Sequence, residues 1–109
     1  MSGQDLLLEI QEKVHLLDKA VNQFGKRGRA AAEAERNYRI LFAKEILKLK
    51  SEGLPATLIP DIAKGNAADA KFERDAADVT YQSAKEAINA LKIQIKVLDE
   101  QLSREWHSQ

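Results

Sequence analysis

The chain has 109 residues, a length that suits one domain with a modest core. It contains no cysteine, which excludes disulfides, thiolate nucleophiles and thiolate metal sites. It carries 17 basic and 17 acidic side chains. This balance disfavours a dedicated nucleic-acid binder, since such proteins usually have a basic excess. Charged residues make up 31% of the chain and aromatic residues 6%, a composition typical of long solvated helices rather than of a sheet.

A first helix is predicted over about residues 4–51. Its end is marked by Lys48 and Lys50, whose charges complement the carbonyl end of a helix, and by Gly53 just beyond. The start of the chain lacks the basic residues and cleavage site of a signal peptide, and no apolar run is long enough for a membrane span, so a cytoplasmic location is expected. Apolar residues recur at spacings of three and four along its first half: Leu7, Ile10, Val14, Leu17, Val21 and Phe24.

A connector is predicted over residues 52–65. It holds both prolines of the chain, Pro55 and Pro60, and closes at Gly65. We expect one or two short helical turns in it. Asn66 is predicted to cap the next helix, because a side-chain oxygen at that position can accept a hydrogen bond from a free amide of the first turn.

A last helix is predicted over about residues 66–106. Its apolar residues form a heptad seam sustained over more than three repeats, typical of coiled-coil packing. The sequence therefore predicts an all-α single domain, 1–109, in which two long helices form an antiparallel coiled-coil-like hairpin. The seam consists of Ala77, Tyr81, Ala84, Ile88, Leu91, Ile95, Leu98 and Leu102.

The pairing of the two helices is predicted to set large side chains against small ones, with Ala34 opposite Tyr81 and Tyr38 opposite Ala77. The charges favour the same pairing, because residues 25–50 have a basic excess and residues 66–91 an acidic one. Ion pairs between the two segments are therefore expected.

The apolar residues exceed what one seam can bury. Leu6, Leu8 and Leu16 are predicted to lie off the first stripe. Because a lone pair of helices would leave these side chains in water, we expect a homo-oligomer, with a dimeric four-helix bundle favoured, or a binding face for another protein. The candidate oligomer or partner face consists of Ile40, Leu41, Leu47, Val79, Ile93 and Val97.

The stretch from Gly25 to Arg39 allows two interpretations. In the first, which we favour, Gly25, Gly28 and Ala32 share a face that lets another helix approach closely, or they mark a kink. In the second, basic side chains bind nucleic acid or a phosphate-bearing ligand. The stretch lacks the spacing and the Ser or Thr of a P-loop. The candidate contacts are Lys26, Arg27, Arg29, Arg36 and Arg39.

Residues for catalysis are not found in the sequence. His15 and His107 are isolated, and no nucleophile stands near a base in the pattern. We therefore assign no catalytic, cofactor-binding or metal-binding residue and do not expect an enzyme. Trp106 is expected to pack over the helix ends.

Two segments, "YRILFAKEILKLKSEGLPATLIPDIAKGN" and "EAINALKIQIKVLDEQLSREW", resemble a group of small helical proteins encoded by phages and prophages of Gram-positive bacteria. The resemblance covers roughly residues 30–106. It implies a location in the bacterial host cytoplasm and an accessory role: an interaction protein that binds or blocks a host or phage protein, for example as a counter-defence inhibitor. The alternative is support of phage replication or recombination through the basic stretch 26–39.

Overall fold

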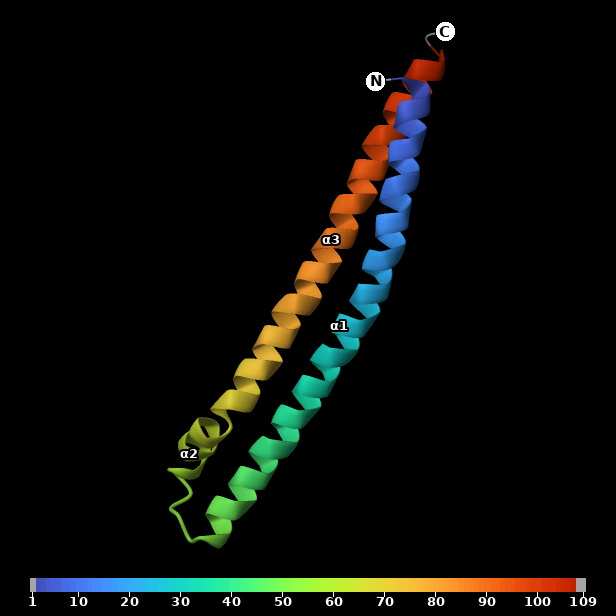
Figure 1. Ribbon diagram of the computed structural model, residues 1–109. Coiled ribbons are helices and arrows are strands. Elements are labelled where there is room, and N and C mark those ends of the chain that lie inside the picture. Colours follow the sequence, from blue (N-terminus) through green and yellow to red (C-terminus); the bar gives the residue numbers. More distant parts are fainter. Residues whose placement is uncertain (1, 108–109) are drawn as a thin grey trace. The chain divides into compact units, whose positions relative to one another are not determined.

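The computed structural model describes residues 2–107, which form helices joined by turns (Figure 1). Helix α1 spans Gly3–Ser51, α2 spans Ile59–Asn66 and α3 spans Ala68–His107. The long helices α1 and α3 run antiparallel, and α2 lies in the connector between them. The predicted all-α helical hairpin with a short helical connector is thus confirmed. Within the described part of the chain, no helix combines the length and the hydrophobicity that crossing a membrane requires.

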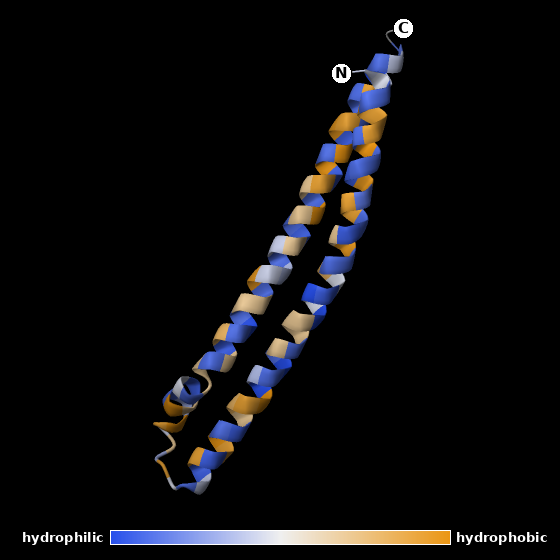
Figure 2. Cartoon of the chain, in the orientation of Figure 1, coloured by the Kyte–Doolittle hydropathy of each residue, from blue (hydrophilic) through white to orange (hydrophobic). Residues whose placement is uncertain are grey.

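The hairpin divides into two compact units. The terminal unit consists of Met1–Lys26 and Gln82–Gln109, and the central unit of Arg27–Tyr81. In each unit a segment of α1 lies beside a segment of α3, and the central unit also contains α2. Hydrophobic and hydrophilic residues alternate turn by turn along both long helices (Figure 2), as expected for helices that are packed on one side only.

The end of α1 is fixed by a glycine in the left-handed region. Gly53 has φ +79°. Glycine adopts this conformation with little steric strain because it has no Cβ. Its amide donates to the Lys50 carbonyl at 3.1 Å, and the Leu54 amide donates to the Leu49 carbonyl at 3.3 Å. This is the Schellman arrangement, which also brings Leu54 into contact with the helix it terminates. The predicted end of the first helix is confirmed.

The densest packing of the central unit lies where the connector meets α1. Leu49, Ile59 and Ala63 are almost fully buried and form one cluster. Pro60 lies in the first turn of α2, where its missing amide proton costs nothing. Ile59 and Ala63 are one helical turn apart, so both point from α2 to the same side. The partly buried side chains packed around the cluster are Phe42, Ile46, Leu54 and Ile62.

The predicted cap of α3 is wrong. Asn66 is the last residue of α2, and α3 begins at Ala68. The Asn66 side chain instead donates a hydrogen bond from Nδ2 to Oε2 of Glu45 on α1 at 3.0 Å. Ala67, which is fully buried, joins the two helices, and its carbonyl accepts from the Lys71 amide at 3.0 Å. The Ala67 amide donates to the Ala63 carbonyl at 3.0 Å, so a carbonyl of α2 accepts from the amide at the junction in place of the expected side-chain cap.

The seam predicted for the last helix is confirmed, because all of its members are half-buried or buried. The stripe predicted for the first helix is half right, because Ile10, Leu17 and Phe24 are half-buried as expected. Leu6, which was expected to lie off the stripe, is buried, whereas Leu7, Val14 and Val21 are exposed. The inward positions of the terminal unit are Gly3, Leu6, Ile10, Lys13, Leu17, Ala20 and Phe24.

The predicted pairing of the helices in the central unit is also wrong. Tyr81 lies against Gly28 rather than Ala34, a displacement of between one and two helical turns. Tyr38 lies under the guanidinium of Arg74, at 4.5 Å from the ring centroid, rather than opposite Ala77. The large ring of Tyr81 thus packs on a glycine. The stacking of Arg74 on Tyr38 fixes the pairing of α1 and α3 further along the same unit.

Candidate functional site

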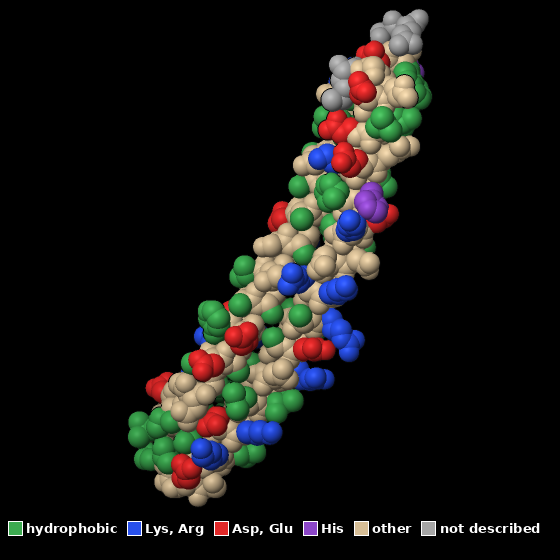
Figure 3. Space-filling model, viewed as in Figure 1, with side chains coloured by type: hydrophobic (Ala, Val, Ile, Leu, Met, Phe, Trp, Pro, Cys, Tyr) green, Lys and Arg blue, Asp and Glu red, His purple; other side chains and the backbone are tan. Residues whose placement is uncertain are grey.

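The five basic residues of the candidate anion site are all exposed on α1. Lys26 belongs to the terminal unit and the other four to the central unit. Helix α1 runs without a break through Gly25 and Gly28, so no free helix amides add to an anion site there. Figure 3 shows Lys and Arg side chains projecting from α1 into solvent.

Two of these arginines are neutralised within their own helix. Arg29 Nε lies 3.2 Å from Oε1 of Glu33, and Arg39 Nε lies 2.7 Å from Oε1 of Glu35. Both pairs are exposed and one turn apart, so each contributes only about 0.3–0.5 kcal/mol. Arg27 forms no ion pair with any described residue. The structure therefore gives a solvated basic surface rather than a convergent pocket.

An ion pair joins α1 to α3 in the central unit, as expected, but its residues and its polarity were not predicted. Arg74 of α3 reaches Glu35 of α1, with Nε 3.5 Å from Oε2, and contacts Asp75 with Nη2 3.0 Å from Oδ1. Its guanidinium also stacks on Tyr38, whose ring stacks on Phe42 at 5.9 Å between centroids. The cation comes from the acidic segment and the carboxylate from the basic one, the reverse of the expected polarity.

Arg74 occupies a seam position, three residues before Ala77 and seven before Tyr81, and only 26% of its side chain is exposed. A charged residue at a heptad core position was the signal that could have identified it, because such residues specify the pairing of coiled-coil helices. The hydrogen bond to Asp75, together with the charges of Asp75 and Glu35, raises the pKa of Arg74 above its ordinary value. The guanidinium is therefore charged at any pH at which the protein is folded.

We predict that Arg74→Ala lowers the melting temperature of the protein by a few degrees, because it removes both the ion pair with Glu35 and the cation–π contact with Tyr38 that join α3 to α1. Arg39→Ala is the matched control, since Arg39 pairs only within its own helix. That change should shift the melting temperature by about one degree or less. Thermal unfolding followed by circular dichroism measures both, and equal shifts would contradict the assigned role of Arg74.

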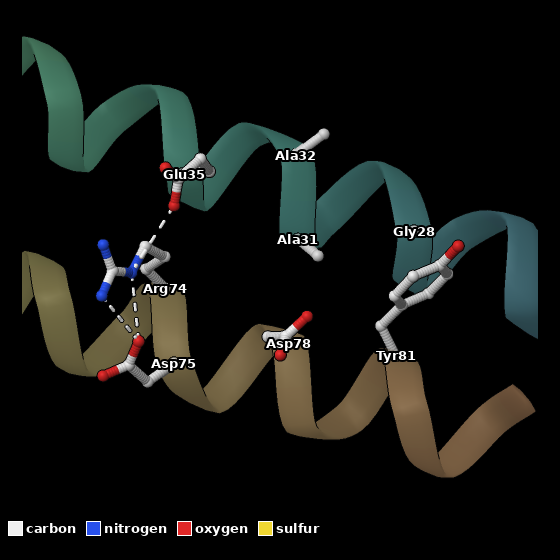
Figure 4. A pocket seen from close by; sticks show the side chains of 8 residues that line it. All are labelled: Gly28, Ala31, Ala32, Glu35, Arg74, Asp75, Asp78 and Tyr81. Carbon is white, nitrogen blue, oxygen red and sulfur yellow. Dashed lines mark hydrogen bonds and ion pairs between the residues drawn. The ribbon is translucent and has the colours of Figure 1, made fainter. Parts of the chain in front are cut away.

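A groove of about 530 Å³ lies beside this ion pair (Figure 4). Tyr81 bounds one end and the Arg74–Glu35 pair the other, and the alanines of α1 form a low wall. Three carboxylates line the groove, but two of them, Glu35 and Asp75, already form ion pairs with Arg74. Among the described residues no group of carboxylates and histidines is arranged to hold a metal ion. The lining consists of Gly28, Ala31, Ala32, Glu35, Arg74, Asp75, Asp78 and Tyr81.

The two glycines of the basic stretch differ in their surroundings. A Cβ at Gly28 would lie 2.9 Å from Cε1 of Tyr81, whereas a Cβ at Gly25 would meet nothing within 4 Å. Close approach therefore explains Gly28 and does not explain Gly25. The same relation recurs at Gly3, where a Cβ would lie 2.8 Å from Nε1 of Trp106. Trp106 does pack at the helix ends, although 60% of it is exposed.

The candidate oligomer or partner face is largely exposed, as the sequence predicted. Leu41 is the exception, because it is half-buried. Ile93 and Val97 border a groove of about 370 Å³ in the terminal unit, together with Glu9 and Lys13 of α1. The exposed members are Ile40, Leu47, Val79, Ile93 and Val97, and Phe72, which was not predicted, joins them.

Comparison with known proteins adds no family or fold. No family model, curated protein or solved structure matches the chain. What the protein does must therefore be inferred from its own surfaces.

Proposed function

We propose that the protein is an interaction module: a helical hairpin that associates with itself and binds or blocks another protein. The observation that supports this proposal is the exposure of large apolar side chains at heptad spacing outside the α1–α3 seam. Leu47 and Phe72 are each more than two-thirds exposed, and Ile40 and Val79 lie seven residues from them on the same helix faces. Side chains of this size gain about 1.5–3 kcal/mol each when a partner buries them.

The outer face of α1 in the central unit defines the chemistry of the partner. Ile40, Ala43 and Leu47 form its apolar half, and Arg36 and Arg29 lie one and two heptads before Ala43. All five are exposed. An acidic amphipathic helix complements this face, since its apolar positions would cover Ile40 and Leu47 and its carboxylates would meet the arginines.

The resemblance to phage-encoded proteins leads us to propose a setting. The partner would be a host or phage protein in the cytoplasm of an infected bacterium, and blocking it would serve the phage, for example by inhibiting a host defence. The proposal requires no cofactor and no chemistry by the hairpin itself, because occupying a surface of the partner is enough to block it.

The test compares proteins retained from infected host cells by the wild-type chain and by Ile40→Glu/Leu47→Glu. We expect the double variant to bind the retained partner at least about 100-fold more weakly, because two charges replace the apolar anchors and repel an acidic helix. Leu8→Glu is the matched control, since it places a carboxylate at an exposed apolar site of the terminal unit, outside the candidate face, and it should leave retention unchanged. Equal retention by the wild-type chain and the double variant would refute the proposed face.

The alternative function is polyanion binding through the basic stretch. Lys26, Arg27 and Arg36 favour it, because these exposed cations form no ion pair with other described residues. Binding of this kind weakens steeply as salt rises. If it occurs, replacing Lys26, Arg27 and Arg29 by alanine should abolish it and leave partner binding through Ile40 and Leu47 intact.

A further inference from the structure

The terminal unit carries a second apolar line on α1. Leu7, Val14 and Val21 are 39%, 42% and 53% exposed and follow one another at seven-residue spacing, so they share one face of the helix. Leu6, one position before this line, is buried in the α1–α3 seam. The apolar arc of α1 is therefore wider than a two-helix pair requires, and its width is typical of a helix with further neighbours.

Helix α3 carries a matching line at the same spacing: Lys85, Lys92, Asp99 and Trp106, all exposed. The two lines border the same side of the unit. Trp106 lies against Gly3, with Nε1 2.8 Å from where a Cβ would be, and Leu7 follows Gly3 by one turn of α1. A line of apolar residues and a line of charges thus run side by side.

We propose that this face of the terminal unit binds the same face of a second copy of the chain, antiparallel and related by a twofold axis at Val14. This inference rests on the self-association in the proposed function and names its surface. Leu7 would meet Val21 of the second copy, and Val14 would meet its own counterpart. A contact of this kind is isologous, so one surface must complement itself.

The charges on α3 satisfy that requirement. The same twofold axis sets Lys92 against Asp99 of the second copy, and Asp99 against Lys92, so both ends of the contact gain an opposite-charge pair. Lys85 meets Trp106 of the second copy, a cation facing an aromatic ring. The centres of the two lines lie side by side. Gly3 and Trp106 are in contact, and Val14 is as many residues from Gly3 as Ile95 is from Trp106. Ile95 lies at the middle of the Lys92–Asp99 span, so one axis passes through the centre of both lines.

The area of the face suits a dimer. Helices of this length extend about 37 Å at about 1.5 Å per residue, and two helices side by side are about 18–20 Å wide. A face of about 700 Å² per copy results, close to the roughly 800 Å² that each partner contributes to a stable protein complex. The product is a four-helix arrangement of the two terminal units that covers Leu7, Val14 and Val21.

Sedimentation equilibrium of the full chain tests the inference, over about 1 to 200 µM because a contact of this size can give a micromolar dissociation constant. We expect the mass to rise from the 12.2 kDa of one chain toward twice that value. Val14→Glu should weaken the dimer more than about 100-fold, because it sets two carboxylates together on the axis. Circular dichroism should show unchanged helix content, since Val14 is outside the seam.

Leu16→Glu is the matched control. Leu16 is as exposed as Val14, at 42%, but it follows Glu9 by one heptad, and Glu9 lines the groove with Val97 on another side of the unit. This variant should dimerise like the wild-type chain. Lys92→Glu and Asp99→Lys should each weaken the dimer about threefold to tenfold, and the two changes together should restore it.

The outcomes separate the inference from the proposed function. A dimer that survives Val14→Glu, or that is not restored by the double charge exchange, overturns the proposed face and leaves self-association standing. A chain that remains a monomer over the whole concentration range overturns both the face and self-association. Binding of another protein through Ile40 and Leu47 is decided by its own experiment.

Discussion

Replacing Leu49 by alanine should lower the free energy of unfolding by about 3 kcal/mol, whereas the same change at Leu47 should lower it by less than about 0.5 kcal/mol. The two leucines are neighbours on one helix, yet Leu49 is 4% exposed and Leu47 is 67% exposed. Leu49 contacts Ile59 and Ala63 in the central cluster, so its removal leaves a cavity that the rigid end of α1 cannot close.

Urea unfolding followed by circular dichroism measures both changes. The variants must be compared at one protein concentration, because self-association makes apparent stability depend on it. Similar losses for the two variants would mean that the cluster around Leu49 does not hold the connector to α1.

Replacing Gly28 by leucine should lower the free energy of unfolding by about 2 kcal/mol, even though leucine is the better helix former. The new side chain would collide with the ring of Tyr81, whose Cε1 lies 2.9 Å from the position of a Cβ. The same change at Gly25 should instead raise the free energy of unfolding by about 1 kcal/mol, because nothing lies within 4 Å there and only the helix propensity changes.

A double-mutant cycle identifies the cause. In a Tyr81→Ala background the loss caused by Gly28→Leu should nearly vanish, which corresponds to a coupling of about 2 kcal/mol between the two positions. If Gly28→Leu costs the same with and without the tyrosine ring, the pairing of these two residues is not what constrains the helices.

The end of α1 and the seam of α3 were predictable because their causes are local. Gly53 permits the left-handed conformation that ends a helix, Pro60 fixes φ in the first turn of α2, and the seam from Ala77 to Leu102 follows from spacing alone. Half of the stripe on α1, at Leu7, Val14 and Val21, was predicted one position too late. Leu6, Leu7 and Leu8 are consecutive, so periodicity could not decide which of them faces the partner helix.

The pairing of the helices was not predictable for a different reason. The alanine-rich stretch between Gly28 and Tyr38 offers several nearly equivalent positions for Tyr81, and a rule that sets large residues against small ones cannot rank them. The observed pairing depends on one glycine and on Arg74, whose contacts with Glu35 and Tyr38 join positions that are distant in sequence. The surroundings of the candidate anion contacts were not predictable either, because the pairing of Arg29 with Glu33 and of Arg39 with Glu35 depends on side-chain geometry.

The cluster at the bend has a consequence for how the chain reaches its fold. Leu49, Leu54, Ile59 and Ala63 lie close together in sequence, so bringing them into contact closes only a short loop and sacrifices little chain entropy. The bend can therefore assemble before any contact between distant residues exists. Each further turn of α1 can then pair with the adjacent turn of α3, so helix pairing propagates outward from the bend. Folding through such local contacts is associated with fast folding rates.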